Sequence, residues 1–177
     1  MICTITRYII KNNRNIRLFS QRAEPDMTFK VLIAIDGSEQ CRNAFDWYLK
    51  MLHSSNNSVV LATVSDTQVQ PAYAFRAGLA LPQEQWKAMV AEDEKRVKDL
   101  LSTYGTSLKA NGIPYKTRAE VGSNAGQHLC HMAKKEKADM IVMGTRGLGT
   151  VRRTVLGSVS DYVLHHSTVP VSICPLS

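Results

Sequence analysis

Apolar and polar residues follow one another in blocks along this chain, and the blocks predict alternating strands and helices. Short continuous apolar runs rich in β-branched residues are typical of strands buried in a parallel sheet. Strands are predicted at 30–36, 57–66, 114–122, 139–144 and 169–175, the third being more polar and therefore nearer an edge. Apolar residues recur at helical spacing in four segments between them, which are 38–52, 82–112, 123–138 and 157–167.

This order of elements predicts an α/β fold with a single-domain, open, five-stranded parallel sheet, Rossmann-like, with helices on both faces. Asp36 and Gly37 follow the first predicted strand directly, and Ser38 is suited to cap the first helix. In such sheets, ligands bind at the carboxyl ends of the strands, near the point where the strand order reverses.

Composition narrows the class of protein. The 177 residues are 44% hydrophobic and 21% charged, as expected of a soluble globular domain, and no apolar run reaches the roughly 18 residues of a membrane-spanning helix. A net charge of +7 without a dense basic and aromatic face does not indicate a nucleic-acid partner. The four cysteines form no C-x-x-C pair, which favours reduced thiols in a cytoplasmic protein.

Residues 1–26 differ from the rest of the chain, because they carry spaced Arg and Lys among apolar residues and no acidic residue before Glu24. Three interpretations remain open: a disordered tail, a true start of translation at Met27, and a mitochondrial transit peptide. The predicted domain therefore covers residues 27–177, with 1–26 as an extension.

A glycine-rich connection of about twelve residues leads from the fourth strand to the last helix, which is long for such a loop. Glycine allows backbone amides to approach a ligand closely, and a helix that begins at Gly157 and Ser158 presents unpaired N–H groups. Together with Arg146, these groups predict a phosphate site. Asp36 could reach a ribose hydroxyl or a metal-bound water, and the backbone of Val64 could reach a base.

The spacing Gly144-x2-Gly147-x9-Gly157-Ser158 resembles the ATP-binding signature of the universal stress protein family. The segments "KVLIAIDGSE" and 138–175 also resemble that family. The resemblance implies a strand order of 3-2-1-4-5, a homodimer joined through residues 169–174, and a nucleotide-dependent sensor or switch in the stress response. It implies ATP, accompanied by Mg²⁺, at Ala34, Asp36, Val64, Met143, Gly144, Arg146, Gly147, Gly157, Ser158 and Val159.

Two other functions remain open. An interaction protein could use the same fold without nucleotide, whereas an adenylating enzyme would carry H-x-G-H or S-G-G-x-D-S near the first strand, and neither motif is present. Hydrolysis of ATP is expected to be slow at most, because no general base other than Asp36 is evident and no catalytic residue is assigned. His128 and His131 are expected to be a surface pair, so no metal site is assigned to protein ligands alone.

Overall fold

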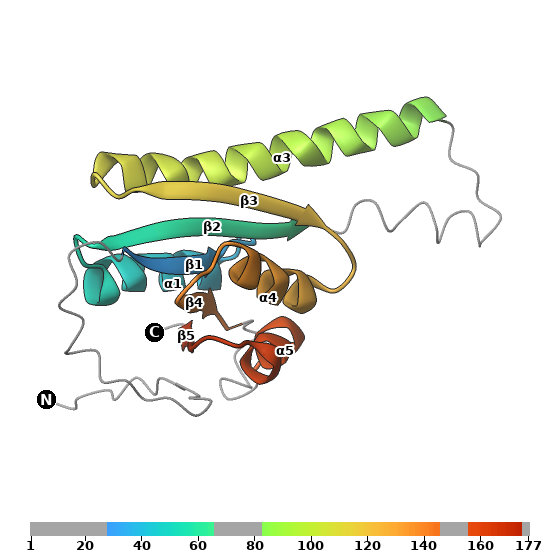
Figure 1. Ribbon diagram of the computed structural model, residues 1–177. Helices are drawn as coiled ribbons and strands as arrows, with labels where there is room; N and C mark the ends of the chain where they lie inside the picture. Colours follow the sequence, from blue (N-terminus) through green and yellow to red (C-terminus); the bar gives the residue numbers. More distant parts are fainter. Residues whose placement is uncertain (1–27, 66–82, 146–155, 175–177) are drawn as a thin grey trace, which may run out of the picture.

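The computed structural model describes residues 28–65, 83–145 and 156–174. Within them, five strands form one parallel sheet in the order β3-β2-β1-β4-β5 (Figure 1). The strands are β1 (Phe29–Ala34), β2 (Asn57–Ser65), β3 (Tyr115–Val121), β4 (Met140–Gly144) and β5 (Val171–Cys174). The predicted α/β fold and strand order are confirmed. The order reverses between β1 and β4, because β1 has β2 on one side and β4 on the other.

Helices cover both faces of the sheet, and each pair of helices shares a hydrophobic core with it. The helices α1 (Glu39–Trp47) and α3 (Gln83–Ala110) pack on one face, and α4 (Ala125–Lys135) and α5 (Ser158–His166) pack on the other. Side chains alternate along each strand, so Val31 and Ile33 belong to the first core and Leu32 to the second. Two-sided burial explains why the central strands are continuous apolar runs.

The first helix ends earlier than its apolar spacing predicts. A π-helical turn, η1 (Tyr48–Leu52), follows α1 directly, and the His53 N–H donates to the carbonyl of Tyr48 over 2.9 Å. The buried Tyr48 hydroxyl lies 3.2 Å from His53 Nδ1 and accepts from Asn57 Nδ2 at 3.4 Å. These contacts join the wide turn to the start of β2.

The longest helix and the third strand lie at the edge of the sheet. Figure 1 shows the amino-terminal part of α3 extending past the end of the sheet. Among the described residues of this helix, only the carboxyl-terminal half supplies buried side chains, namely Leu101, Tyr104 and Leu108, whereas Trp86 stays half-buried. The helix ends at Ala110, and the chain turns at Gly112, whose positive φ of 67° suits a glycine that follows a helix C-terminus. Every residue of β3 except Glu120 is exposed, which confirms its predicted edge position.

Candidate functional site

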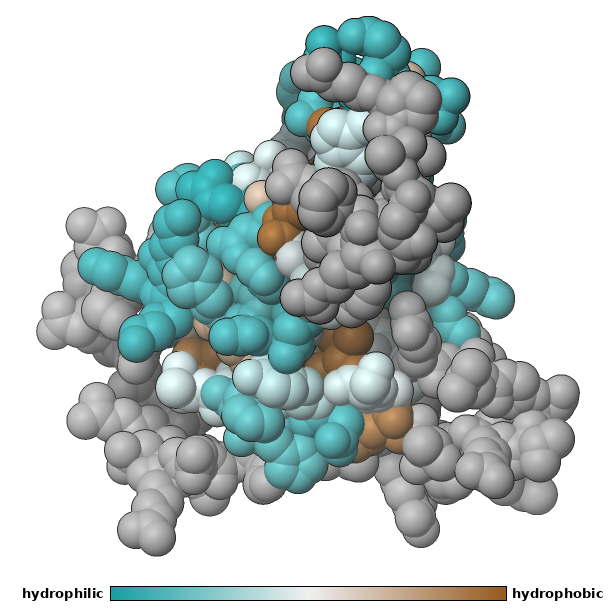
Figure 2. Space-filling view, turned by 90° about the vertical axis from the view of Figure 1, so that its right-hand side faces the viewer, coloured by the Kyte–Doolittle hydropathy of each residue, from teal (hydrophilic) through white to brown (hydrophobic). Residues whose placement is uncertain are grey.

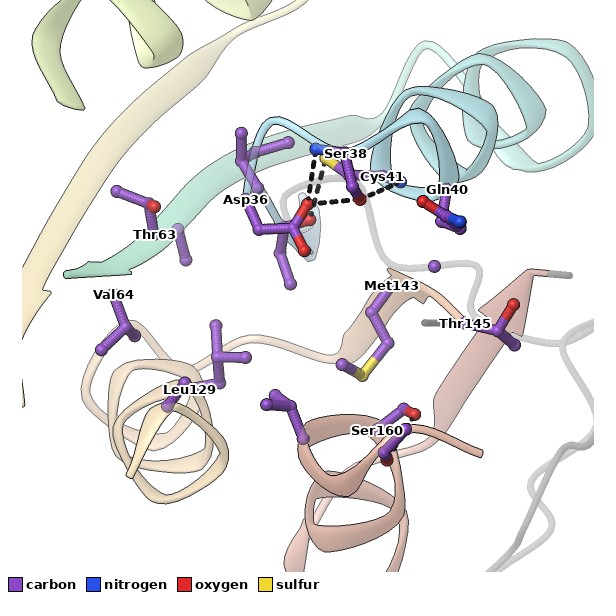
Figure 3. A pocket seen from close by; sticks show the side chains of 17 residues that line it. Asp36, Ser38, Gln40, Cys41, Thr63, Val64, Leu129, Met143, Thr145 and Ser160 are labelled. Carbon is purple, nitrogen blue, oxygen red and sulfur yellow. Dashed lines mark hydrogen bonds between the residues drawn. The ribbon is translucent and has the colours of Figure 1, made fainter. Parts of the chain in front are cut away.

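A cavity of about 150 Å³ lies at the carboxyl ends of β1, β2 and β4, beside the first turns of α1, α4 and α5 (Figure 3). This is where the strand order reverses, the usual ligand position in open α/β sheets. Its volume is similar to that of cavities that bind a single aromatic ring. Figure 2 views the molecule from the side toward which the strands point, where hydrophobic residues appear in small areas between hydrophilic ones.

Most of the predicted site residues line this one cavity. They come from four separate parts of the chain: the ends of β1, β2 and β4, and the start of α5. The predicted residues in the lining are Ala34, Asp36, Val64, Met143, Gly144, Gly157 and Val159. Ser158 is exposed and is not among the lining residues, whereas Arg146 and Gly147 lie outside the described residues.

The lining also contains residues that sequence reasoning missed. They are Ile35, Ser38, Gln40, Cys41, Ala62, Thr63, Ala125, Leu129, Thr145 and Ser160. Four of them, Ile35, Thr63, Thr145 and Ser160, are immediate neighbours of predicted residues, so proximity in sequence to those residues was an available signal. Ala125 and Leu129 had no such signal, since they reach the cavity only because α4 packs beside β2 on the face that it shares with α5.

Asp36 is held in a fixed orientation by the turn that follows β1. Its Oδ1 accepts hydrogen bonds from the Ser38 backbone N–H at 2.9 Å and from the Ser38 hydroxyl at 2.6 Å. The same hydroxyl oxygen accepts from the Cys41 N–H at 3.1 Å and so caps α1, as predicted. Gly37 makes the turn possible with a φ of +81°. One carboxylate oxygen of Asp36 is thereby occupied, and no described residue bonds to the other.

The start of α5 leaves backbone donors without a side-chain cap. Gly157 occupies the N-cap position, with φ −68° and ψ 156°, and it has no side chain that could accept from the first turn. The Ser160 hydroxyl does not cap the helix either, because it donates to the Gly157 carbonyl at 2.9 Å. The first N–H groups of a helix have no intrahelical acceptor, so those of Ser158 and Val159 remain available to an anion.

The presence of glycine at position 144 has a structural explanation that does not involve a ligand. A Cβ atom at this position would lie 2.5 Å from the carbonyl carbon and oxygen of Gln40 and 3.0 Å from the nitrogen of Cys41. The end of β4 therefore approaches the first turn of α1 too closely for a side chain. This contact between β4 and α1 fixes the wall of the cavity between β1 and β4, where the strand order reverses.

The walls of the cavity differ in chemistry. Figure 3 shows Val64 and Leu129 on one side, Asp36 with Ser38 on another, and Gln40 near Thr145 beside the end of β4. Burial raises the pKa of the Cys41 thiol, so this side chain stays neutral in the wall. Asp36 is the single carboxylate among the described lining residues. The apolar wall suits an aromatic base. The hydroxyl groups and the one carboxylate suit a ribose, and the free amides at the start of α5 suit a phosphate.

The histidine pair on α4 is engaged with one carboxylate. His128 Nδ1 lies 2.7 Å from Glu120 Oε2, and His131 Nδ1 lies 3.3 Å from Glu120 Oε1. Across the residues that the structure describes, no group of three His, Cys, Asp or Glu side chains is arranged to hold a metal ion. The same residues include no helix that is both long and apolar enough to span a membrane.

An open parallel sheet that is covered on both faces, with a polar cavity where its strand order reverses, defines a doubly wound α/β protein. The model of the universal stress protein family matches residues 27–175, and the chain belongs to this family.

Relatives align with more than four fifths of this chain. A universal stress protein of Synechocystis sp. is 26% identical over 149 residues, which cover 81% of this chain and 96% of the relative. The structure of a family member from Arabidopsis thaliana with AMP bound superimposes with a TM-score of 0.60 at 22% identity, covering 82% and 90% of the two chains. A universal stress protein in complex with cAMP gives a TM-score of 0.56 at 25% identity, covering 86% and 100%.

Proposed function

We propose that this chain is an ATP-binding universal stress protein that uses nucleotide occupancy as a switch or sensor in the stress response. The observation that carries the proposal is the cavity at the strand-order reversal. It combines an apolar wall, an oriented carboxylate and the uncapped start of a helix, which match the three parts of a nucleotide.

Each part of the nucleotide has a proposed set of residues. Ala34 and the backbone of Val64 contact the base, and Asp36 binds the ribose through its free oxygen. The amides of Gly157, Ser158 and Val159 bind the phosphates. Met143 and Gly144 form the floor between them, and Arg146 and Gly147 are proposed to complete the phosphate site with Mg²⁺ as the companion of the triphosphate.

The related structures that contain nucleotides support the proposal that this chain binds a nucleotide. That the nucleotide is ATP is the more specific part of the proposal. AMP and cAMP, which occupy two of the related structures, share adenine, ribose and phosphate with ATP. Hydrolysis is proposed to be slow at most. In the part of the cavity that the structure describes, the carboxylate that could act as a base is already bonded to Ser38. Phosphate release at about 1 per second or faster would contradict this part of the proposal.

The protein is further proposed to act in the cytoplasm as a homodimer joined through residues 169–174. Among the described residues, the strand β5 ends the sheet and pairs only with β4, and an unpaired edge is a template for a second copy. Light scattering of the purified full chain should give twice the mass of one chain. A single-chain mass at micromolar concentration would refute this interface.

Calorimetric titration of the full chain with Mg-ATP, AMP and cAMP tests the proposed ligand. With a Kd near 10 μM, saturation to 100 times Kd should stabilise the fold by about 2.7 kcal/mol in a parallel thermal-shift assay. Gly157→Val should abolish binding, because a β-branched side chain crowds the first amides of α5. Ala88→Val, exposed on α3, is the matched control and should bind normally. Binding by Gly157→Val at the level of this control would show that the phosphate site is misassigned.

A further inference from the structure

Thr63, at the edge of the cavity, carries a hydroxyl group that has no hydrogen-bond partner among the described residues. The residue is 5% exposed and lines the cavity at the carboxyl end of β2. Its hydroxyl makes no hydrogen bond within the described part of the chain, whereas the hydroxyls of Ser38 and Ser160 are both engaged. Every fully buried side-chain oxygen or nitrogen in that part has a partner. The small exposed area of Thr63 must therefore include its hydroxyl oxygen, and the residue lines the cavity.

This hydroxyl receives no hydrogen bond from the described part of the protein. A ligand that displaces water from the cavity leaves the hydroxyl unpaired unless it supplies a hydrogen bond, and valine would fill the same space in a strand without that cost. The chain nevertheless has threonine between Ala62 and Val64, both of which are apolar. We therefore expect a ligand in the cavity to form the hydrogen bond that the described residues do not supply.

The position of β2 indicates which part of a nucleotide Thr63 meets. The uncapped start of α5 lies on the β4 side of the cavity, and β2 is two strands away from β4. Neighbouring strands are about 4.8 Å apart, so the ends of β2 and β4 are separated by about 10 Å. A nucleotide with its phosphates at α5 therefore has its base across the end of β2.

Thr63 and Val64 flank the end of β2 on opposite faces. Val64 packs with the core on the α4 side, and Thr63 points to the α1 side because side chains alternate along a strand. Figure 3 shows Thr63 on the same side of the cavity as Asp36, with Val64 nearer to Leu129. A base lying across this strand end meets an apolar side chain on one side and the hydroxyl on the other.

We propose that Thr63 determines base specificity by accepting a hydrogen bond from the exocyclic amino group of adenine. This inference rests on the proposed nucleotide function. A site that is built to bond a polar ligand group discriminates against the analogue that lacks it, because its own group is then left unpaired. Thr63 thus selects for a purine with a polar substituent at C6.

The test is a calorimetric cycle that combines two ligands with four forms of the full chain. The ligands are Mg-ATP and the triphosphate of purine riboside, which is ATP without the 6-amino group. The proteins are wild type, Thr63→Val, Thr63→Ser and the control Thr117→Val on the exposed strand β3. Wild type should bind ATP about 10-fold more tightly than the analogue. Thr63→Val should weaken ATP binding about 10-fold and change the affinity for the analogue less than about twofold.

The two other variants keep the wild-type ratio if the inference holds, since Thr63→Ser retains the hydroxyl and Thr117 is not among the residues that line the cavity. Without ligand, Thr63→Val should melt at the wild-type temperature or above it, because it removes an unpartnered polar group. An equal loss of affinity for both ligands, or a lowered melting temperature, would show a structural role and overturn the inference. Unchanged affinities in Thr63→Val would overturn it as well.

The same cycle distinguishes the failure of this inference from the failure of the proposed function. If wild type binds ATP and Thr63→Val does not alter the preference over the analogue, the inference alone is refuted. If wild type binds neither ligand at millimolar concentration, the nucleotide function is refuted and the inference with it.

Discussion

Replacing Gly144 by alanine tests the physical reason for a glycine at the end of β4. The added Cβ would lie 2.5 Å from the Gln40 carbonyl atoms and 3.0 Å from the Cys41 nitrogen. Carbon atoms in contact prefer about 3.5–4.0 Å, so the backbones must separate by about 1 Å. The first turn of α1 resists this movement, because Ser38 caps it and the Cys41 side chain is buried beneath it.

The expected cost follows from two opposing effects. Overpacking of this kind destabilises by about 1–3 kcal/mol, whereas replacing glycine by alanine stabilises by about 0.4–1 kcal/mol through the unfolded chain. The second effect applies because φ at Gly144 is not positive. We therefore expect the free energy of unfolding to fall by about 1–2 kcal/mol in urea titrations, with an unchanged dependence on denaturant.

Gly105→Ala provides the matched control for this substitution. A Cβ at Gly105 would also be close to its neighbour, 2.8 Å from the ring of Tyr115. The Tyr115 side chain is 38% exposed, so its ring can rotate away from the added methyl group. In addition, alanine is favoured over glycine inside a helix such as α3. Gly105→Ala should therefore be neutral or slightly stabilising. Equal stability changes in the two variants would refute the argument that backbone proximity fixes Gly144.

Two further substitutions test contacts that hold the fold and the cavity. Arg118→Gln should lower the free energy of unfolding by about 1 kcal/mol at pH 7, because Arg118 donates a hydrogen bond to Glu136. That bond lowers the pKa of Glu136 below its ordinary range, so its contribution is present above that range and is lost as the pH falls through the lowered pKa. Urea titrations at about pH 7 and pH 3 should show the difference between variant and wild type disappear, and a constant difference would exclude this pair as its cause. Ser38→Ala should lower the melting temperature by the equivalent of about 1 kcal/mol and weaken nucleotide binding, because it removes the cap of α1 and a donor to Asp36. Normal nucleotide affinity in this variant would show that the orientation of Asp36 is unimportant.

The sheet was predictable because its strands are signalled locally. Continuous apolar runs such as 30–36 and 139–144 identify buried strands without any knowledge of their partners, and the polar run 114–122 identifies an edge. The π-helical turn after Trp47 was not predictable in this way. It depends on the contacts of Tyr48 with His53 and Asn57, and apolar spacing in the helix carries no information about them.

The site was predictable where its residues follow a strand and unpredictable where they come from a packed helix. Asp36 and Val64 lie at strand ends, and the carboxyl ends of parallel strands share one edge of the sheet. Leu129 lies at the start of the second turn of α4 and reaches the cavity through tertiary packing. Thr63 was unpredictable for another reason: in the sequence it is one polar residue within a buried strand, and only the structure shows that its hydroxyl has no partner among the described residues.

The glycines of the signature have different physical origins, and this decides which of them can test nucleotide binding. Gly144 is required by its contact with α1 even if no ligand ever binds, so a glycine there is compatible with a nucleotide-independent protein. Gly157 has a φ of −68°, which any residue adopts, so its backbone conformation does not demand glycine. A requirement for glycine at 157 therefore has to come from what approaches the first amides of α5. For this reason, Gly157→Val should lose nucleotide affinity at nearly unchanged stability, whereas a variant at Gly144 changes both together. A Gly157→Val protein that unfolds as readily as Gly144→Ala would remove the argument that this glycine is kept for a ligand.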